Sequence, residues 1–255
     1  MLILNRSELK AMAPMGDAIA LMKEAFRELS AGRAVSPLRT PIEVGDDLGV
    51  ALFMPAYVPG SAALGMKLVS VFGQNQQHGL PTIHAVVCLV SAETGEPLAM
   101  IEGGYLTALR TDLLARPESS TLAVIGAGAQ GMTQAAAVCA VRPIERLIVV
   151  ARSQPSLDRF ASRVRSEIPA YAGSVETTTD ASAVQFADVL CTATTSKTPV
   201  YDDALLKPGA HVNAVGAFTP QMQEVPSATI VRARVIVDSF EPAFAEAGDL
   251  INPVN

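Results

Sequence analysis

Three glycines at residues 126, 128 and 131 have the spacing G-x-G-x-x-G and indicate a chemical task. An apolar run at 122–125 precedes them, and an uncharged helical pattern at 132–141 follows. In such a unit, Gly126 makes the turn out of the strand, Gly128 lets the backbone approach a pyrophosphate, and Gly131 lets the helix pack on the strand. The phosphates would lie at the helix N-terminus, against unpaired N–H groups. Glycines alone would also fit an ordinary loop, but the order strand, turn, helix predicts a dinucleotide site.

The next predicted strand, residues 146–151, is followed by Arg152 and Ser153. About twenty residues after the last glycine, an NAD enzyme usually offers an Asp or Glu to the ribose 2′-hydroxyl. A carboxylate would repel a 2′-phosphate, whereas a guanidinium can bind it through two parallel hydrogen bonds. The sequence therefore predicts NADP(H) as the preferred cofactor and NAD(H) as the alternative. The simpler interpretation is that Arg152 is a solvated charge at a strand end.

Three cations in the first half of the chain are candidates for binding a substrate. Lys67 lies within the apolar run 64–71, where a charged side chain either reaches solvent or meets an anion or a catalytic demand. Reaching solvent is the simpler explanation for this lysine. Arg39 and Arg110 could each bind a carboxylate or be surface charges. Together with a nicotinamide site, the three cations indicate an anionic substrate held for hydride transfer.

Composition excludes several classes of protein. The chain has 255 residues, 49% of them hydrophobic, which is enough for one large domain or two ordinary ones. Its net charge of −6 and the lack of a basic block argue against nucleic-acid binding. Cys88, Cys139 and Cys191 are far apart in apolar runs, and predict buried thiols of a cytosolic protein rather than a disulfide framework or a metal site. The cysteines thus favour a cytoplasmic protein, and we expect no signal peptide before Asn5, because residues 1–4 are too short for its hydrophobic region.

One uncharged stretch, residues 119–141, is long enough to span a bilayer. It contains three glycines, two glutamines and two threonines, and its pattern changes from strand to helix halfway. A buried β-turn-α unit explains this stretch better than a membrane span does.

The elements that carry these residues fall into two groups. Residues 7–31 predict a helix that packs on a sheet and stops at Gly32. A meander of antiparallel or mixed strands is expected next, with a hairpin connection at 93–97. Its predicted strands are residues 39–44, 49–55, 64–72, 82–90 and 98–102.

The pattern becomes an alternation of β and α after a boundary that we place near Arg116 and Pro117. Nearly continuous apolar strands with helical crossovers predict a doubly wound parallel sheet covered on both faces. The fold class is therefore α/β, with a smaller α+β substrate domain at 1–116 and a Rossmann domain at 117–255. Beyond the first strand and its helix, the predicted strands are 146–151, 174–178, 188–193, 211–216 and 235–238, with helices or loops at 155–167 and 179–186.

Six blocks give the chain a resemblance to a known family. They are PLRTPIEV at 37–44, GMKLVSVF at 65–72, the long block 79–111, TLAVIGAGAQG at 121–131, HVNAVGAFTPQMQEVP at 211–226 and EAGDL at 246–250. In this order the sequence resembles the ornithine cyclodeaminase and mu-crystallin family over nearly all of its length.

The resemblance implies a dimeric, two-domain enzyme whose substrate sheet pairs with that of its partner. It implies a substrate carboxylate bound by Arg39, Lys67 and Arg110. The nucleotide contacts of the family match, besides the glycines, a set of residues from both domains: Thr82, Thr111, Ala129, Gln130, Arg152, Thr194, Val215 and Gly216.

One departure from the family pattern narrows the expected reaction. Ornithine cyclodeaminases carry an aspartate shortly after the N-A-V-G block, and this chain has Phe218 there. A phenyl ring can neither accept a proton nor bind an ammonium as a carboxylate does, so ornithine cyclodeamination is not expected. The A-F-T-P variant resembles the branch that reduces Δ1-pyrroline-2-carboxylate and Δ1-piperideine-2-carboxylate to proline and pipecolate.

The residues left suit that reduction. Hydride transfer to the imine carbon needs a protonated imine nitrogen, and Lys67 is the candidate proton donor. Burial and Arg110 are expected to make that proton easier to give up. Arg39 and Arg110 would hold the carboxylate in a near-attack geometry.

The chain is shorter than the family pattern at two places, and three other functions stay open as alternatives. The helix after Thr111 is shorter than the family's by about seven residues, roughly two turns, and the chain stops at Asn255 before the segment that returns to the first domain. Either residues are missing at both places or the protein is truncated, and we expect the first, since losing a connecting helix would expose core. The competing functions are an alanine or other amino-acid dehydrogenase, an ornithine cyclodeaminase, and a non-catalytic NADPH-binding protein of the mu-crystallin type.

Overall fold

The computed structural model describes residues 1–12, 15–45, 48–103, 115–237 and 240–254. It divides the chain into two compact units, Met1–Arg110 and Thr111–Asn255, each with its own sheet. The division falls outside the described residues, so the boundary near Arg116 stays a prediction.

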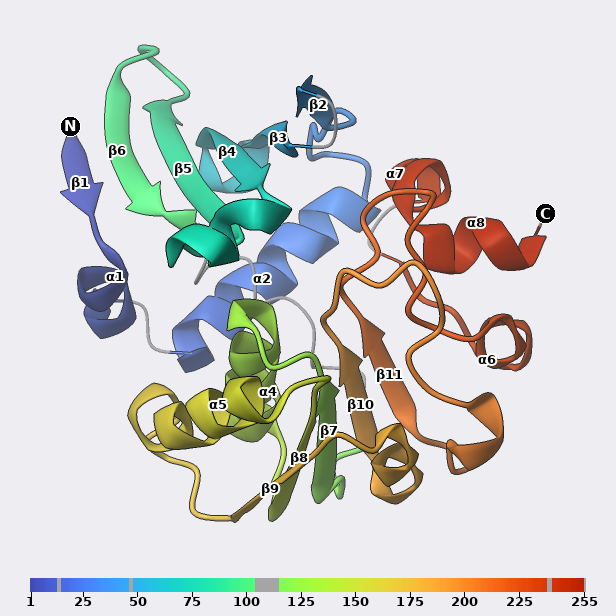
Figure 1. Cartoon of the computed structure of the whole chain (residues 1–255). Helices are drawn as coiled ribbons and strands as arrows, with labels where there is room; N and C mark the ends of the chain where they lie inside the picture. Colours follow the sequence, from blue (N-terminus) through green and yellow to red (C-terminus); the bar gives the residue numbers. More distant parts are fainter. Residues whose placement is uncertain (13–14, 46–47, 104–114, 238–239, 255) are drawn as a thin grey trace. The chain divides into compact units, whose positions relative to one another are not determined.

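The first unit is built on a six-stranded sheet in the order β1-β6-β5-β4-β3-β2 (Figure 1). Neighbouring strands from β2 to β6 are antiparallel, which confirms the predicted meander, and Gly95 (φ 76°) lies in the hairpin between β5 and β6. Strand β1 was not predicted, and it pairs in parallel with β6 at the edge. The strands are β1 (Leu2–Leu4), β2 (Thr40–Val44), β3 (Gly49–Val58), β4 (Ala63–Val71), β5 (Ile83–Ser91) and β6 (Pro97–Glu102).

Two helices, α1 (Arg6–Met12) and α2 (Met15–Ser30), replace the single helix expected at 7–31, so that prediction is wrong in its continuity. The sequence between them contains Pro14, whose ring nitrogen has no hydrogen to donate to a helix. α1 packs against β6 and α2 against β3. The predicted stop is confirmed, because Gly32 has a φ of 68° and donates its N–H to the Leu29 carbonyl at 3.0 Å.

The second unit contains a five-stranded sheet in the order β11-β10-β7-β8-β9, in which every neighbouring pair is parallel (Figure 1). The doubly wound α/β fold is confirmed. Its strands are β7 (Thr121–Ile125), β8 (Arg146–Val150), β9 (Ser174–Thr178), β10 (Val189–Thr192) and β11 (His211–Ala214). Its helices are α4 (Ala129–Val141), α5 (Gln154–Glu167), α6 (Ser227–Arg232), α7 (Phe240–Glu246) and α8 (Gly248–Val254). Short 3-10 turns are η4 (Ala181–Phe186) and η5 (Asp203–Leu205), with η1 (Pro59–Ser61) and η2 (Gly73–His78) in the first unit.

Alternate residues of the central strand β7 face opposite sides of this sheet. Leu122 and Val124 pack in one core with residues of α4 and α5, whereas Ala123 and Ile125 pack in a second core that includes Leu206. Both faces are therefore covered, which explains why the strands are apolar at nearly every position.

A strand predicted at 235–238 is absent over residues 235–237, which are irregular. Its apolar composition suggested a strand, but a strand also needs a neighbour, and within the described residues the sheet ends at β11. Val235 and Ile236 are 44% and 56% exposed.

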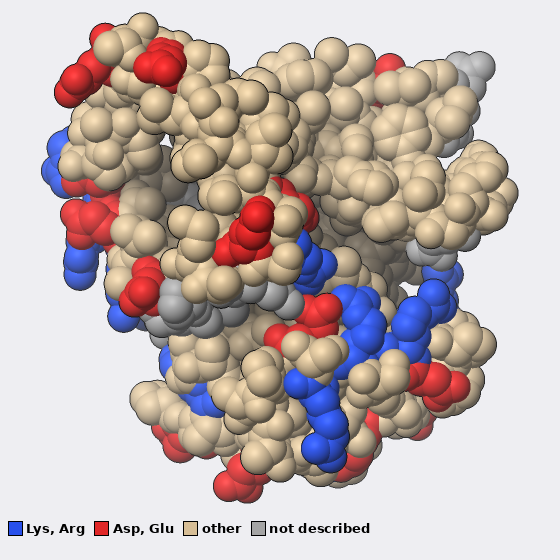
Figure 2. Space-filling model, turned by 90° about the vertical axis from the view of Figure 1, so that its left-hand side faces the viewer, with Lys and Arg blue, Asp and Glu red and all other residues tan. Residues whose placement is uncertain are grey.

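The expectations from composition have mixed outcomes. The uncharged stretch 119–141 forms β7 and α4, as expected, and among the described residues no helix is long and apolar enough to cross a membrane. All three cysteines are free thiols, but only Cys191 is fully buried; Cys88 and Cys139 are half-buried. On the face drawn in Figure 2, basic and acidic side chains stand next to one another, and neither sign covers it.

Candidate functional site

The three motif glycines differ in what surrounds them. Gly126 has a φ of 113°, and a side chain there would overlap the Ala193 carbonyl oxygen. A Cβ at Gly131 would overlap the Gly126 carbonyl oxygen and lie 3.1 Å from Val124 Cγ1. Around Gly128, by contrast, a Cβ would meet nothing within 4 Å among the described residues. Packing thus requires glycine at 126 and 131, and the third glycine faces open space.

The open space lies at the N-terminus of α4. Gly128 is its N-cap, and no side chain caps this end. Gly128 and Ala129 are exposed, while Gln130 is half-buried. Uncapped N–H groups at the start of a 13-residue helix bind anions through their hydrogen bonds and the helix dipole. These residues fit a pyrophosphate.

Arg152 and Ser153 lie just beyond the end of β8, and both are exposed. Ser153 is the N-cap of α5 and its hydroxyl donates to Ser156 Oγ at 2.9 Å. Strand β8 is the direct neighbour of β7, so these residues stand beside the glycine turn at the same edge of the sheet.

Thr194, Val215 and Gly216 follow β10 and β11 on the other side of β7. Thr194 and Val215 are half-buried, and the Val215 N–H donates to the Thr192 carbonyl at 3.0 Å. Because the strands are parallel, their carboxyl ends bring the glycine turn and these residues to one edge, which is where open α/β sheets bind their ligands.

Glu224 links the loops after β10 and β11 at this edge, and it was not predicted from the sequence as a site residue. Its side chain is fully buried, and its carboxylate accepts the N–H of Thr194 at 2.5 Å and the N–H of Gly216 at 2.7 Å. Burial raises the pKa of Glu224 against the hydrogen bonds from Thr194 and Gly216, which lower it. A Cβ at Gly216 would overlap the Glu224 carboxylate, so glycine is required at that position.

Asp249, in the first turn of α8, holds Glu224 in turn. Its Oδ1 accepts the backbone N–H of Glu224 at 2.6 Å and that of Val225 at 2.9 Å. Burial raises the pKa of Asp249 as well, with these N–H groups acting in the opposite direction. The sequence could have drawn attention to Glu224, because it is the one Asp, Glu, Lys or Arg between Lys207 and Arg232.

The candidates of the first unit lie on its sheet. Lys67 is half-buried in β4, in register with Met54 on β3 and Val87 on β5. Arg39 directly precedes β2 and Thr82 directly precedes β5, and both are half-buried. Arg110 and Thr111 lie outside the described residues, so the substrate role given to the one and the nucleotide role given to the other stay predictions.

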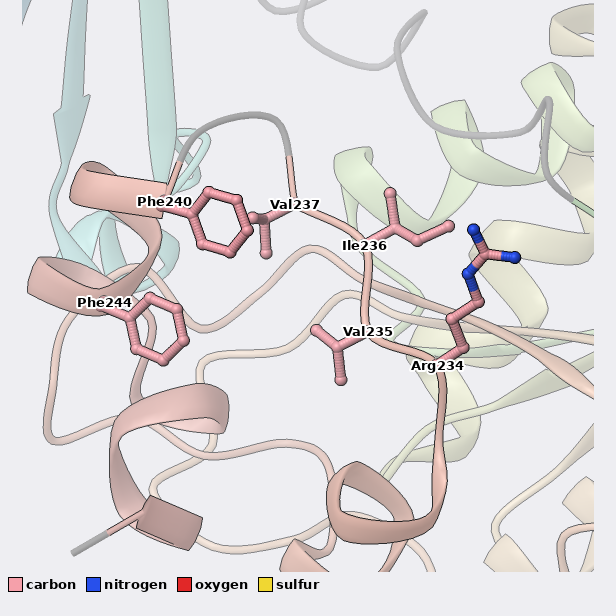
Figure 3. A pocket seen from close by; sticks show the side chains of 6 residues that line it. All are labelled: Arg234, Val235, Ile236, Val237, Phe240 and Phe244. Carbon is pink, nitrogen blue, oxygen red and sulfur yellow. The ribbon is translucent and has the colours of Figure 1, made fainter. Parts of the chain in front are cut away.

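A separate apolar pocket of about 290 Å³ lies in the second unit. The parallel rings of Phe240 and Phe244, 6.4 Å apart, line it together with the irregular segment 234–237 (Figure 3). None of the predicted site residues lines this pocket, and among the described residues no group of three His, Cys, Asp or Glu side chains is placed to hold a metal.

Comparison with known proteins identifies the family. Residues 1–253 match the model of the ornithine cyclodeaminase/mu-crystallin family. The chain is 39% identical over 267 aligned residues to a Δ1-pyrroline-2-carboxylate reductase of Bacillus cereus, covering 100% of this chain and 80% of the relative.

Two solved structures are similar along the whole chain. The Δ1-pyrroline-2-carboxylate reductase of Thermococcus litoralis, in complex with NADH and L-proline, superposes with a TM-score of 0.92 at 37% identity, over 100% of this chain and 80% of that one. An archaeal alanine dehydrogenase dimer with bound NAD gives a TM-score of 0.86 at 30% identity, over 99% and 78%. Because the family model and the curated relative both match nearly the whole sequence, this chain belongs to the ornithine cyclodeaminase/mu-crystallin family.

Proposed function

We propose that this protein is an NAD(P)H-dependent reductase of cyclic ketimines, acting on Δ1-pyrroline-2-carboxylate or Δ1-piperideine-2-carboxylate to form L-proline or L-pipecolate. The observation that carries the proposal is the similarity over the whole chain to the Thermococcus litoralis enzyme, whose structure holds NADH and L-proline. Phe218 supports it, because this half-buried ring lies two residues after Gly216 and cannot replace the aspartate of a cyclodeaminase.

Different residues of the chain would donate the proton and bind the substrate carboxylate. When bound, the dinucleotide supplies a hydride from nicotinamide C4 to the imine carbon. Lys67 would donate a proton to the imine nitrogen, so that C=N becomes CH–NH and the charges balance. Arg39 and Arg110 would bind the carboxylate and fix the ring for attack.

We propose NADP(H) as the preferred cofactor and a homodimer as the working form. Arg152 supports the first, since it is exposed at the end of β8, where a 2′-phosphate would lie. The dimer reported for the archaeal alanine dehydrogenase supports the second. Light scattering on the purified protein tests the assembly.

The deciding assay follows NADPH absorbance with freshly prepared Δ1-pyrroline-2-carboxylate or Δ1-piperideine-2-carboxylate, with NADH in parallel. Fast oxidation of NADPH, with no ammonia released from ornithine and NAD+, is the expected result. Equal specificity constants for NADPH and NADH would contradict the cofactor preference. No oxidation with either imine would contradict the ketimine reaction.

Lys67→Ala tests the proposed proton donor. Turnover is expected to fall about a hundredfold or more, because general acid catalysis contributes on this scale, while the Kd for NADPH stays within about twofold. Steady-state kinetics and a binding titration measure the two quantities separately. Turnover close to that of the wild type would leave Lys67 without a catalytic role.

An amino-acid dehydrogenase is the second candidate function, and the similarity to the archaeal alanine dehydrogenase favours it. The same cations would bind the carboxylate of L-alanine. Incubation with L-alanine and NAD(P)+ distinguishes the two, because NAD(P)H formation with ammonia release would identify the dehydrogenase.

A further inference from the structure

Glu224 has no part in the proposed reaction, yet its surroundings are unusual for a carboxylate. The side chain is fully buried, and in the described part of the chain its interactions are hydrogen bonds rather than ion pairs. Burying an unpaired charge is costly, so the contacts that it makes must compensate. Those contacts include two backbone N–H groups, of Thr194 and of Gly216, from two different loops.

The segment around Glu224 is tied to the first of these loops at further points. The Gln223 N–H donates to the Ser196 carbonyl at 3.1 Å, and the Val200 N–H donates to the Glu224 carbonyl at 2.9 Å. The Asp249 carboxylate accepts the backbone N–H of Glu224 at 2.6 Å. The loop after β10 is therefore joined to the segment around Glu224 by several hydrogen bonds.

The strand order decides which part of the cofactor meets these loops. A dinucleotide crosses an open α/β sheet where the strand order reverses, with one half on each side. Here β7 lies between β8 and β10. The glycine turn and Arg152 lie on the β7–β8 side, which suits the phosphates and the adenosine ribose. The loops after β10 and β11, held by Glu224, are left for the nicotinamide half.

We infer that Glu224 is a positioning residue for the nicotinamide half of the cofactor, because its one buried carboxylate fixes the loops after both β10 and β11. The inference rests on the proposed function only in taking a nicotinamide dinucleotide as the cofactor. It does not depend on the substrate that is reduced.

Glu224→Gln tests this with a matched pair of ligands, NADPH and 2′-phospho-ADP-ribose, or NADH and ADP-ribose where NADH binds more tightly. The amide keeps one acceptor oxygen and turns the other into a donor that faces an N–H. The Kd for the dinucleotide is expected to rise about tenfold or more, while the Kd for the ligand without nicotinamide stays within about twofold. Calorimetry or fluorescence titration of the full chain measures both.

Asp188→Asn is the matched control. Asp188 also accepts two backbone N–H groups, those of Ser120 and Thr121 at 2.9 Å each, but at the amino ends of the strands. This variant is expected to unfold at a lower temperature with both dissociation constants unchanged. A purely structural role for Glu224 would give Glu224→Gln the same result.

Three outcomes would overturn the inference: neither ligand weakened, both weakened equally, or the same loss in the control. If Glu224→Gln does not fold, Glu224→Asp keeps the charge but shortens the reach, and the same comparison applies. If neither variant folds, Glu224 serves folding and the inference is wrong. Binding without ketimine turnover would contradict the proposed function and leave this inference intact.

Discussion

At each end of the strands in the parallel sheet, a carboxylate joins neighbouring segments by accepting two backbone N–H groups. We call the end where the strands begin the amino edge and the end where they finish the carboxyl edge. At the amino edge, Asp188 does so with 19% of its side chain exposed and with Lys207 Nζ 2.5 Å away. At the carboxyl edge, Glu224 does so fully buried, with no ion pair among the described residues.

The pKa values differ in direction accordingly. Burial alone would raise the pKa of Asp188, but the hydrogen bonds from Lys207, Ser120 and Thr121 outweigh it and lower the pKa to about 2. For Glu224, burial prevails and the pKa is raised. The amino edge thus has an arrangement that stabilises the fold, whereas the carboxyl edge keeps a costly group whose benefit we expect in cofactor binding.

The largest expected effect is a loss of stability on substituting Gly131, which is tightly packed, in contrast to Gly128, which faces open space. Gly131→Ala places a methyl group against the Gly126 carbonyl oxygen, which is backbone and cannot yield. We expect a loss of about 3 kcal/mol or more in the free energy of unfolding, as in overpacked cores. Urea denaturation measures it, and a variant as stable as the wild type would show that the turn is less tight than described.

Gly128→Ala is expected to do the reverse. Its methyl group meets no protein atom within 4 Å among the described residues, so the free energy of unfolding should change by less than about 0.5 kcal/mol. The same methyl group would occupy the space of the pyrophosphate, and the Kd for NADPH should rise about a hundredfold, or about 2.7 kcal/mol. Unchanged NADPH binding in a titration would move the phosphate site away from Gly128.

Lowering the pH is expected to remove the stabilising contribution of Asp188 at the amino edge. The pKa of Asp188 is lowered in the folded protein from 3.8 to about 2, so its stabilising contribution is present above about pH 4 and is lost as the pH falls toward 2. We expect about 2 kcal/mol from this group. Denaturation curves at pH 6 and pH 3 should show a smaller difference for Asp188→Asn than for the wild type, and an equal difference would contradict the assignment.

The smallest effect concerns Arg152. Removing its guanidinium in Arg152→Ala should lower the ratio of the specificity constants for NADPH and NADH about tenfold, equivalent to about 1.4 kcal/mol. Stability should not change, because Arg152 is exposed. A ratio unaffected by the substitution would make Arg152 the solvated charge of the simpler interpretation.

Local patterns predicted most of the fold because most of it depends on neighbours along the chain. Alternating or continuous apolar runs located all the strands between β2 and β11, and the glycine spacing located the turn between β7 and α4. The failures involve pairings over long separations. Residues 235–237 have the composition of a strand but no strand beside them among the described residues, and β1 is only three residues long and pairs with β6.

The candidate site shows the same limit. Gly131 could be predicted because the atoms that exclude a side chain there, Gly126 O and Val124 Cγ1, belong to the same strand and turn. Gly126 was predicted from the glycine spacing, although the Ala193 carbonyl that also excludes a side chain there comes from the loop after β10. Glu224 could be noticed as a lone acid, but the N–H groups that it accepts belong to residues 8 and 30 positions away. Only the strand order of the folded sheet brings Thr194 and Gly216 to the same carboxylate.

The edge strand β1 has a consequence for folding during synthesis. Leu2 pairs with Ala99, and Ile3 remains 74% exposed even when the strand is formed. At about 5–20 residues per second, the ribosome completes β6 roughly 5–20 s after β1 has been made. Throughout that interval the apolar tripeptide lacks the strand with which it pairs, so β1 cannot join the sheet before β6 has been made.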